Sequence, residues 1–302
     1  MQDSAVIPAT TTYRMTSLAW ALAVHSATET LRGEAGVDLP GYSPGPEVAL
    51  LAGLDEPTRA GIAGELYTAG IMDAAGNIQR QWLRALGQAA TAPIRVSLVS
   101  RSDGLSTHCR VDLFEGRGIA VEFTRPVATA ADGKVAAVGL AGVVTVTLFS
   151  EAVLWPVLAR SMPPFPELTA GGGGPDASAE ESGPVPGRDG AKTTLSAADV
   201  AALAGGGAAG VPPGVATAVA AAKATVYLEV QSRAAGTVSP NRAAGVWALS
   251  DVLYSVRTAG PATARRLIMV ETASGDIARQ LIWHVLGAHD SLARGTSAEP
   301  AS

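Results

Sequence analysis

Two short-range residue pairs offer the strongest candidates for chemistry, because imidazole and thiolate groups serve as bases, nucleophiles and metal ligands. His108 directly precedes Cys109. Neighbouring residues on a β-strand point to opposite faces, so on the strand expected here they cannot form a dyad. His284 and His289 are five residues apart, which on a helix separates them by roughly 140°, whereas a metal pair needs the i, i+4 spacing. We therefore expect a structural Cys109 and no metal site.

The remaining motifs do not indicate an enzyme. Gly171 to Gly174 has no Lys-Ser or Lys-Thr after it and no strand before it, so it is not a phosphate-binding loop. We find no nucleophile motif, dinucleotide fingerprint or metal signature, and we expect no cofactor. The acidic residues on predicted strands or turns have no obvious catalytic partner, and we expect them to form ion pairs with Arg110, Arg242 or Arg257. These acids are Glu115, Glu122, Glu229, Asp251 and Glu271.

A repeat organises the chain. The stretch from Ile94 to Arg125 aligns without a gap on Val226 to Arg257, at a constant offset of 132 positions. Ser100-Arg101 falls on Ser232-Arg233, and the alternating apolar residues of the first stretch fall on those of the second. The unit is too long for a solenoid repeat and occurs twice, which indicates one duplicated module.

The similarity continues on both sides of the repeat and predicts the fold. Gln81 to Thr91 matches Pro213 to Lys223, and the segment from Val143 resembles the one from Leu267, a strand turning into a helix. Each half then has a helix, three or four meandering strands and a second helix. Because the connections are too short for crossover helices, the sheets must be antiparallel. We predict an α+β fold of two similar halves in a pseudo-twofold arrangement, with a central antiparallel β-sheet flanked by helices.

The local signals before and between these strands predict further elements. Residues 1–12 are expected to be a loose terminus, and Met15 to Leu31 a helix. Glu56 to Ala69 is a second helix, ended by Gly70. Asp103-Gly104 marks a hairpin with a loop longer than two residues, and Gly116 to Gly118 marks the next tight turn.

The composition divides the chain. From Met162 to Thr194 four consecutive glycines and several prolines replace the apolar pattern, which is typical of a linker. The predicted parts are an N-terminal half at 1–161, a disordered linker at 162–195, a C-terminal half at 196–290 and a tail at 291–302.

Composition and charge exclude several classes of protein. The net charge is −5 and only 16% of the residues are charged. Lys134, Lys192 and Lys223 are the only lysines and lie far apart, whereas nucleic-acid binding needs clustered cations. A single cysteine excludes an intramolecular disulfide. No apolar run has the roughly eighteen residues of a spanning helix, and Ser17 to Val24 is short for a signal peptide, so we expect a cytoplasmic protein.

The chain has Gly70-Ile71-Met72-Asp73 with Gly76-Asn77, then a short helix ending at Ala92-Pro93, and then Arg95-Val96 at the start of the strands. This succession resembles the EspG family of cytosolic chaperones in actinobacterial type VII (ESX) secretion. In that family a helix ending in Leu and Gly is followed by a small turn, a Leu-containing helix and a first strand, and the resemblance covers roughly Thr58 to Leu286 apart from the linker. The residues that match this succession are Leu66, Gly70, Ile71, Asp73, Gly76, Leu83, Leu86, Pro93 and Val96, and Trp247, Asp251 and Tyr254 are similar to elements near the family's C-terminal end.

The resemblance implies a protein that binds the hydrophobic tip of a PPE protein paired with a PE protein and keeps it soluble until export. The sequence of the second half is compatible with this function, because from Val246 to Val256 it carries apolar residues on both faces of the predicted strands. We predict a contact surface made of Trp247, Leu249, Tyr254 and Val256 together with Ile282, Trp283 and Leu286 of the last helix. Two alternatives stay open: each of these residues could be core, and the apolar face could be buried by a second copy in a scaffold dimer. An enzyme with an unrecognised site is a third possibility.

Overall fold

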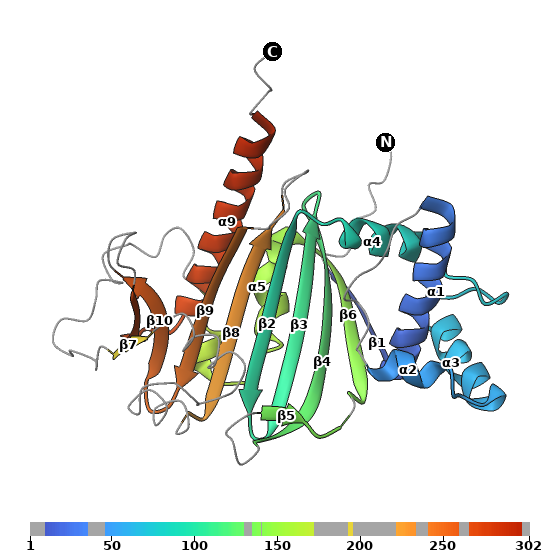
Figure 1. Ribbon diagram of the computed structural model, residues 1–302, viewed down its shortest axis with the longest axis horizontal. Coiled ribbons are helices and arrows are strands. Elements are labelled where there is room, and N and C mark those ends of the chain that lie inside the picture. The colour runs from blue at the N-terminus through green and yellow to red at the C-terminus, as the bar shows by residue number, and fades with distance from the viewer. Residues whose placement is uncertain are drawn as a thin grey trace, which may run out of the picture. The chain divides into compact units, whose positions relative to one another are not determined.

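The structure is a computed structural model that describes residues 10–35, 46–129, 135–139, 141–171, 193–195, 222–233, 241–259 and 266–297. Figure 1 shows its helices and strands. In chain order the elements up to the middle of the chain are β1 (Thr10–Thr16), α1 (Ser17–Ala35), α2 (Pro46–Leu51), α3 (Glu56–Thr68), α4 (Arg80–Ala90), β2 (Ile94–Ser102), β3 (Leu105–Phe114), β4 (Arg117–Thr129), β5 (Val135–Ala137) and β6 (Val143–Ser150). They are followed by a 3-10 turn (Glu151–Val153), α5 (Leu154–Ala159), α6 (Pro166–Thr169), β7 (Thr193–Leu195), β8 (Ala224–Ser232), β9 (Asn241–Leu249), β10 (Leu253–Ala259), β11 (Arg266–Thr272) and α9 (Asp276–Ser297).

The strand order reflects the sequence repeat. Neighbouring strands follow the order β1-β6-β4-β3-β2-β8-β9-β10-β11-β7, with β5 paired to β4. Starting from β2 and β8, the order reads β2, β3, β4, β6 on one side and β8, β9, β10, β11 on the other. The pairs β1–β6, β4–β6, β8–β9, β9–β10 and β10–β11 are antiparallel. The predicted α+β fold with a large antiparallel sheet flanked by helices is confirmed.

Two tight turns set the register of the first-half strands. Only Asp103 and Gly104 separate β2 from β3, with φ of 50° and 71°, and Glu115 and Gly116 separate β3 from β4 with the same two values. Positive φ at both central residues is the geometry of a type I′ hairpin turn, whose twist matches that of the strands. The loop at Asp103-Gly104 is therefore shorter than the sequence suggested, and the second turn ends before Gly118, which lies inside β4.

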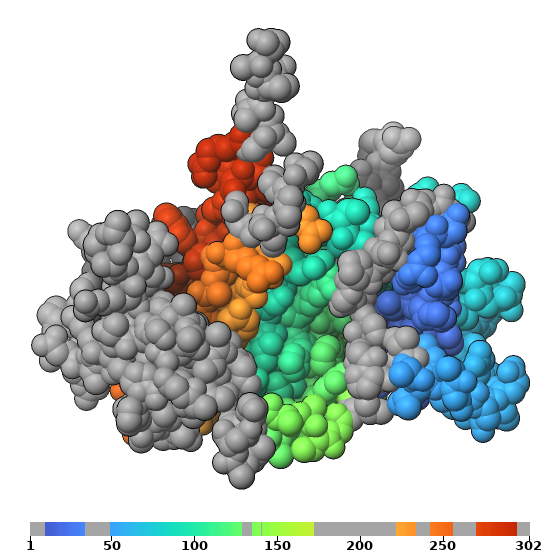
Figure 2. Space-filling view, viewed as in Figure 1, coloured from blue at the N-terminus to red at the C-terminus, as the bar shows by residue number. Residues whose placement is uncertain are grey.

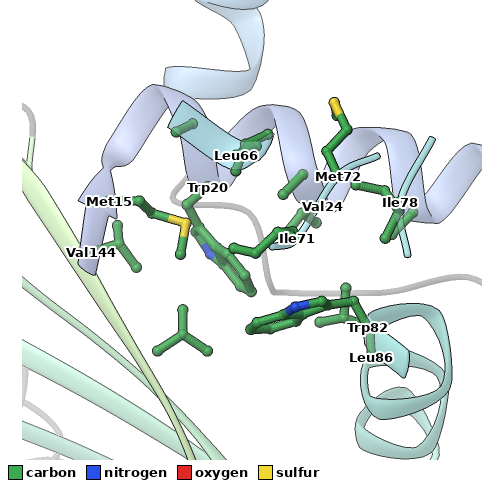
Figure 3. Packing of buried hydrophobic residues seen from close by; sticks show 14 of the residues in the cluster. Met15, Trp20, Val24, Leu66, Ile71, Met72, Ile78, Trp82, Leu86 and Val144 are labelled. Carbon is green, nitrogen blue, oxygen red and sulfur yellow. The ribbon is translucent and has the colours of Figure 1, made fainter. Parts of the chain in front are cut away.

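The contacts divide the chain into two compact units, the first of which comprises Met1–Arg95, Cys109–Thr124 and Leu140–Val157. In this unit α1 packs against α2, α3, α4 and β6. Figure 3 shows Trp20 of α1 and Trp82 of α4 pointing into the same interior, and both are about 1% exposed. Tyr13 meets Trp82 edge to face at a centroid distance of 4.9 Å. Helices α1, α3 and α4 thus share one apolar core with the strands β4 and β6.

Two polar contacts fix the helix ends in this unit. The carboxylate of Glu65 on α3 accepts hydrogen bonds from the backbone N–H and the hydroxyl of Thr16, at 2.7 and 2.8 Å, just before α1 begins. The Asp55 side chain accepts a hydrogen bond from the Thr58 N–H and so caps α3. Gly70 follows α3 with a φ of +67°, as the sequence predicted for a helix-ending glycine.

The second unit comprises Val96–His108, Arg125–Gly139 and Leu158–Ser302. In it α9 packs on β8 and β9, along which it runs in Figure 1. The side chains of β8 alternate, with Val226, Leu228 and Val230 buried and the residues between them half-buried. On β9, by contrast, residues 245–249 are all buried, so both faces of this strand are covered within the chain.

The structure differs from the sequence-based boundaries in three places. Thr10 to Thr16 is a strand paired with β6, whereas residues 10–12 were predicted to be loose terminus and Met15 and Thr16 to begin the first helix. Residues 162–171, assigned to the linker, include α6 and the fully buried Leu168. The last helix continues to Ser297, through most of the predicted tail. The described residues do not include 172–192 and 196–221. These two ranges contain most of the predicted linker and most of the second-half repeat helix.

Candidate partner-binding surface

Helix α9 presents its apolar residues on two faces. It follows Gly275, which has a φ of +82°, and begins at Asp276. The residues that face β8 and β9 recur at helical spacing and are buried: Ile277, Ala278, Leu281, Val285 and Ala288. This set forms one stripe along the helix and explains why this segment packs against the sheet.

The part of α9 that faces away from the sheet carries three large apolar side chains that stay partly or mostly exposed. Ile282 is 46% exposed, Trp283 is 74% exposed and Leu286 is 59% exposed. Relative to the buried Leu281, the last two lie about 200° and 140° around the helix. We call these three residues the α9 stripe. Part of α9 is visible in red in Figure 2.

Trp247 and Leu249, which were predicted as contact residues, lie in the interior of the chain, each 2% exposed. The indole N–H of Trp247 donates a hydrogen bond to Oδ2 of Asp276 at 2.9 Å. Asp276 is itself only 3% exposed and also accepts from Arg279 at 3.4 Å. The sequence left open whether these residues are contact or core residues, and the structure places both in the core. The hydrogen bond of Trp247 holds the first turn of α9 against β9.

The two other predicted contact residues lie on β10. Tyr254 is half-buried and pairs with Ala248 and Glu271 in the neighbouring strands. Val256 pairs with Val246 and Met269, and its side chain is outside the description. The structure thus brings together Ile282, Trp283 and Leu286 on one helix face, and it separates Trp247 and Leu249 from them by burying both.

A polar network on β8 and β9 contains one predicted ion pair. Glu229 accepts a hydrogen bond from the Tyr227 hydroxyl at 2.9 Å and one from Gln231 at 2.6 Å, and it lies 3.6 Å from Arg242. Burial is the main cause, and the contact with the Glu229 carboxylate the second, of a rise in the pKa of Tyr227 to about 12. The Glu229 carboxylate is thus held by two hydrogen bonds and one ion pair.

Asp112 is a residue that the sequence reasoning missed. Its carboxylate is fully buried and accepts hydrogen bonds at 2.8 Å from Nε of Arg95 and from Nε of Arg110. The available signal was the spacing, because residues 110 and 112 lie two apart on one strand and so face the same side. Arg110 therefore forms an ion pair, as expected, but with an acid that the sequence had not singled out.

The candidate chemical residues do not converge in the part of the chain that the structure describes. Cys109 is buried and His108 is half-buried, with a ring nitrogen 3.1 Å from the Ser106 hydroxyl. Burial lowers the pKa of His108, with further lowering from the charges of Arg101 and Arg125. Burial also lowers the pKa of His284. The described residues contain no group of three or more His, Cys, Asp or Glu side chains placed to hold a metal ion.

None of the described helices combines the length and apolar composition needed to cross a membrane.

Comparison with known families finds no matching family, and comparison with curated proteins finds no matching sequence. Comparison with solved structures finds similarity to the Mycobacterium tuberculosis type VII secretion system chaperone EspG5, solved in complex with a PE25-PPE41 dimer. The two chains are 8% identical with a TM-score of 0.44, over 90% of this chain and 94% of the other.

Proposed function

We propose that this protein is a cytoplasmic chaperone of type VII (ESX) secretion. It binds the hydrophobic tip of a PPE protein in a PE-PPE heterodimer and keeps that protein soluble until export. The observation that carries the proposal is the α9 stripe, an exposed apolar surface on a helix whose other face is packed into the core. The identity of the partner comes from the sequence resemblance to the EspG family.

The chemistry of the α9 stripe suits a protein partner. Tryptophan is enriched among the few interface residues that supply most of the binding energy, and Trp283 is the most exposed large apolar side chain among the described residues. Ile282 and Leu286 lie beside it on the same face. An apolar tip docking on this face would remove all three side chains from water, which is the main favourable contribution to such association.

The anchoring of α9 also supports a binding role. The Trp247–Asp276 hydrogen bond and the buried apolar residues of α9 hold the helix in place before a partner binds. A surface fixed in advance loses less conformational entropy on binding than a flexible one. The α9 stripe is therefore presented in an ordered form.

The test is to co-express the tagged chain with a PE-PPE pair from the same genome and to measure affinity with the purified components. Trp283→Ala should weaken binding by about 30-fold or more, as expected for an interface hot spot. Because Trp283 is 74% exposed, its removal should leave the stability of the free chain nearly unchanged. Tyr67→Ala is the matched control, since Tyr67 is an exposed aromatic residue on α3, and its affinity should equal that of the wild type.

Two results would contradict the proposal. If Trp283→Ala and Leu286→Ala both bind the PE-PPE pair as tightly as the wild type, the α9 stripe is not the contact surface. If no PE-PPE pair binds and sedimentation shows a dimer that Trp283→Ala dissociates, the stripe joins two copies of this chain, which is the scaffold alternative.

A further inference from the structure

A separate cavity lies among the first three helices of the chain. It has a volume of about 190 Å³ and is lined by Leu22, His25, Leu51, Ala52, Leu54 and Arg59. The first two residues lie one turn apart on α1, and the last lies on α3. The outer surfaces of α2 and α3 appear in blue in Figure 2.

The walls of this cavity are mainly apolar and its size suits a small group. Leu51 is buried, while Leu22 and Leu54 are half-buried, so three leucine side chains form the interior. An apolar cavity of about 150 Å³ accommodates benzene in a protein interior. The cavity therefore has room for a phenyl ring or a branched aliphatic group, and it is too small for a typical drug-sized ligand.

Cationic and imidazole groups border the same cavity. One guanidinium nitrogen of Arg59 donates a hydrogen bond to the backbone oxygen of Leu51 at 3.1 Å. This bond holds the charged group at the wall, because Leu51 is itself part of the lining. His25, on α1, is exposed and contributes a second polar group.

Two acidic residues near the lining in sequence are engaged elsewhere. Asp55 accepts the hydrogen bond that caps α3, from the Thr58 N–H. Glu29, one turn after His25, forms an ion pair with Arg32 at 2.9 Å. Among the residues that the structure describes, Arg59 has no carboxylate partner, so a cation at an apolar cavity is left for an anion from outside the chain.

We propose that this cavity binds an amphipathic carboxylate, with its phenyl or branched aliphatic group among the leucines and its carboxylate on Arg59. Arginine binds carboxylates through short, charge-assisted hydrogen bonds. Two kinds of ligand have this combination of an apolar group and a carboxylate. One is a free aromatic or branched-chain acid, and the other is the C-terminal residue of a polypeptide. This site is independent of the α9 stripe.

The test is a titration of the full chain followed by ligand-observed NMR, with phenylacetate as the free acid and acetyl-glycyl-phenylalanine as the peptide. The expected result is saturable binding with a dissociation constant of about 1 mM or lower, the range for a ligand of this size. Tighter binding of phenylacetate assigns the source to a free acid. Tighter binding of the peptide assigns it to a polypeptide C-terminus.

Two variants of the cavity, one control variant and two neutral probes make the result specific. Ala52→Phe should abolish binding by filling the cavity, and because Ala52 is exposed, the fold should be retained, as far-UV circular dichroism can verify. Arg59→Gln should weaken binding about tenfold through loss of the charged hydrogen bond. Arg84→Gln, at an exposed arginine on α4, is the matched control and should bind like the wild type. Absence of saturable binding by both acids would overturn the proposal. Binding of phenylacetamide and the peptide amide as tightly as the corresponding acids would also overturn it.

Discussion

The hydrogen bond between Trp247 and Asp276 can be measured directly as a contribution to stability. Trp247→Phe retains an aromatic ring but removes the indole N–H that donates to Oδ2 of Asp276 at 2.9 Å. Both residues are at most 3% exposed, so water cannot replace the lost donor. A buried hydrogen bond to a charged group contributes about 1.5–3 kcal/mol, and we expect at least this loss in the free energy of unfolding.

A double-mutant cycle separates the hydrogen bond from the smaller size of phenylalanine. The cycle combines Trp247→Phe with Asp276→Ala and follows urea unfolding by far-UV circular dichroism, because removing a tryptophan alters the fluorescence signal. We expect a coupling energy of about 1.5–3 kcal/mol between the two sites. A coupling below about 0.5 kcal/mol, the level found for independent sites, would show that this contact does not hold α9 against β9.

Two further predictions concern the first half of the chain. Gly118→Ala should destabilise the protein by about 1–3 kcal/mol, because an added Cβ would lie 2.7 Å from Cε1 of Phe149. Gly142→Ala, where no atom lies within 4 Å of the new Cβ, is the control in the same thermal unfolding experiment, and equal losses would refute the explanation. His108 has a pKa lowered below its ordinary value of 6.5 by burial and then by neighbouring arginines. The unfolded chain therefore binds this proton more readily, and the stability present above pH 6.5 is lost as the pH falls below that value. His108→Gln should lose less stability than the wild type between about pH 7.5 and about pH 5.5, and an identical loss would contradict the assignment.

The strand framework could be predicted because its signals are local. Alternation in segments such as Val226 to Val230 requires only that one face be buried. The duplication then predicted a second set of strands, which the order β8, β9, β10, β11 matches. The turn at Asp103-Gly104 was visible in the residue types, but its length was not, since only the pairing of β2 with β3 determines how far the strands extend.

Some boundaries depended on contacts that no local pattern shows. Thr10 to Thr16 is rich in threonine and polar in character, and it is a strand because β6 offers it an edge. Leu168 follows several prolines in a segment that resembles linker, yet it is fully buried. In both cases tertiary packing outweighs composition, because burial and pairing with distant residues supply the stability that the local sequence lacks.

The sequence by itself determined that the second half carries more large apolar residues than one sheet face can bury, and it identified Ile282, Trp283 and Leu286 on the last helix. It could not determine which of these residues meet water. The tertiary structure decided this by placing α9 on β8 and β9, which buries Trp247 and Leu249 and leaves the α9 stripe outside. The physical reason is that burial depends on which element covers a face, and that coverage is a property of the whole chain rather than of any residue's hydrophobicity.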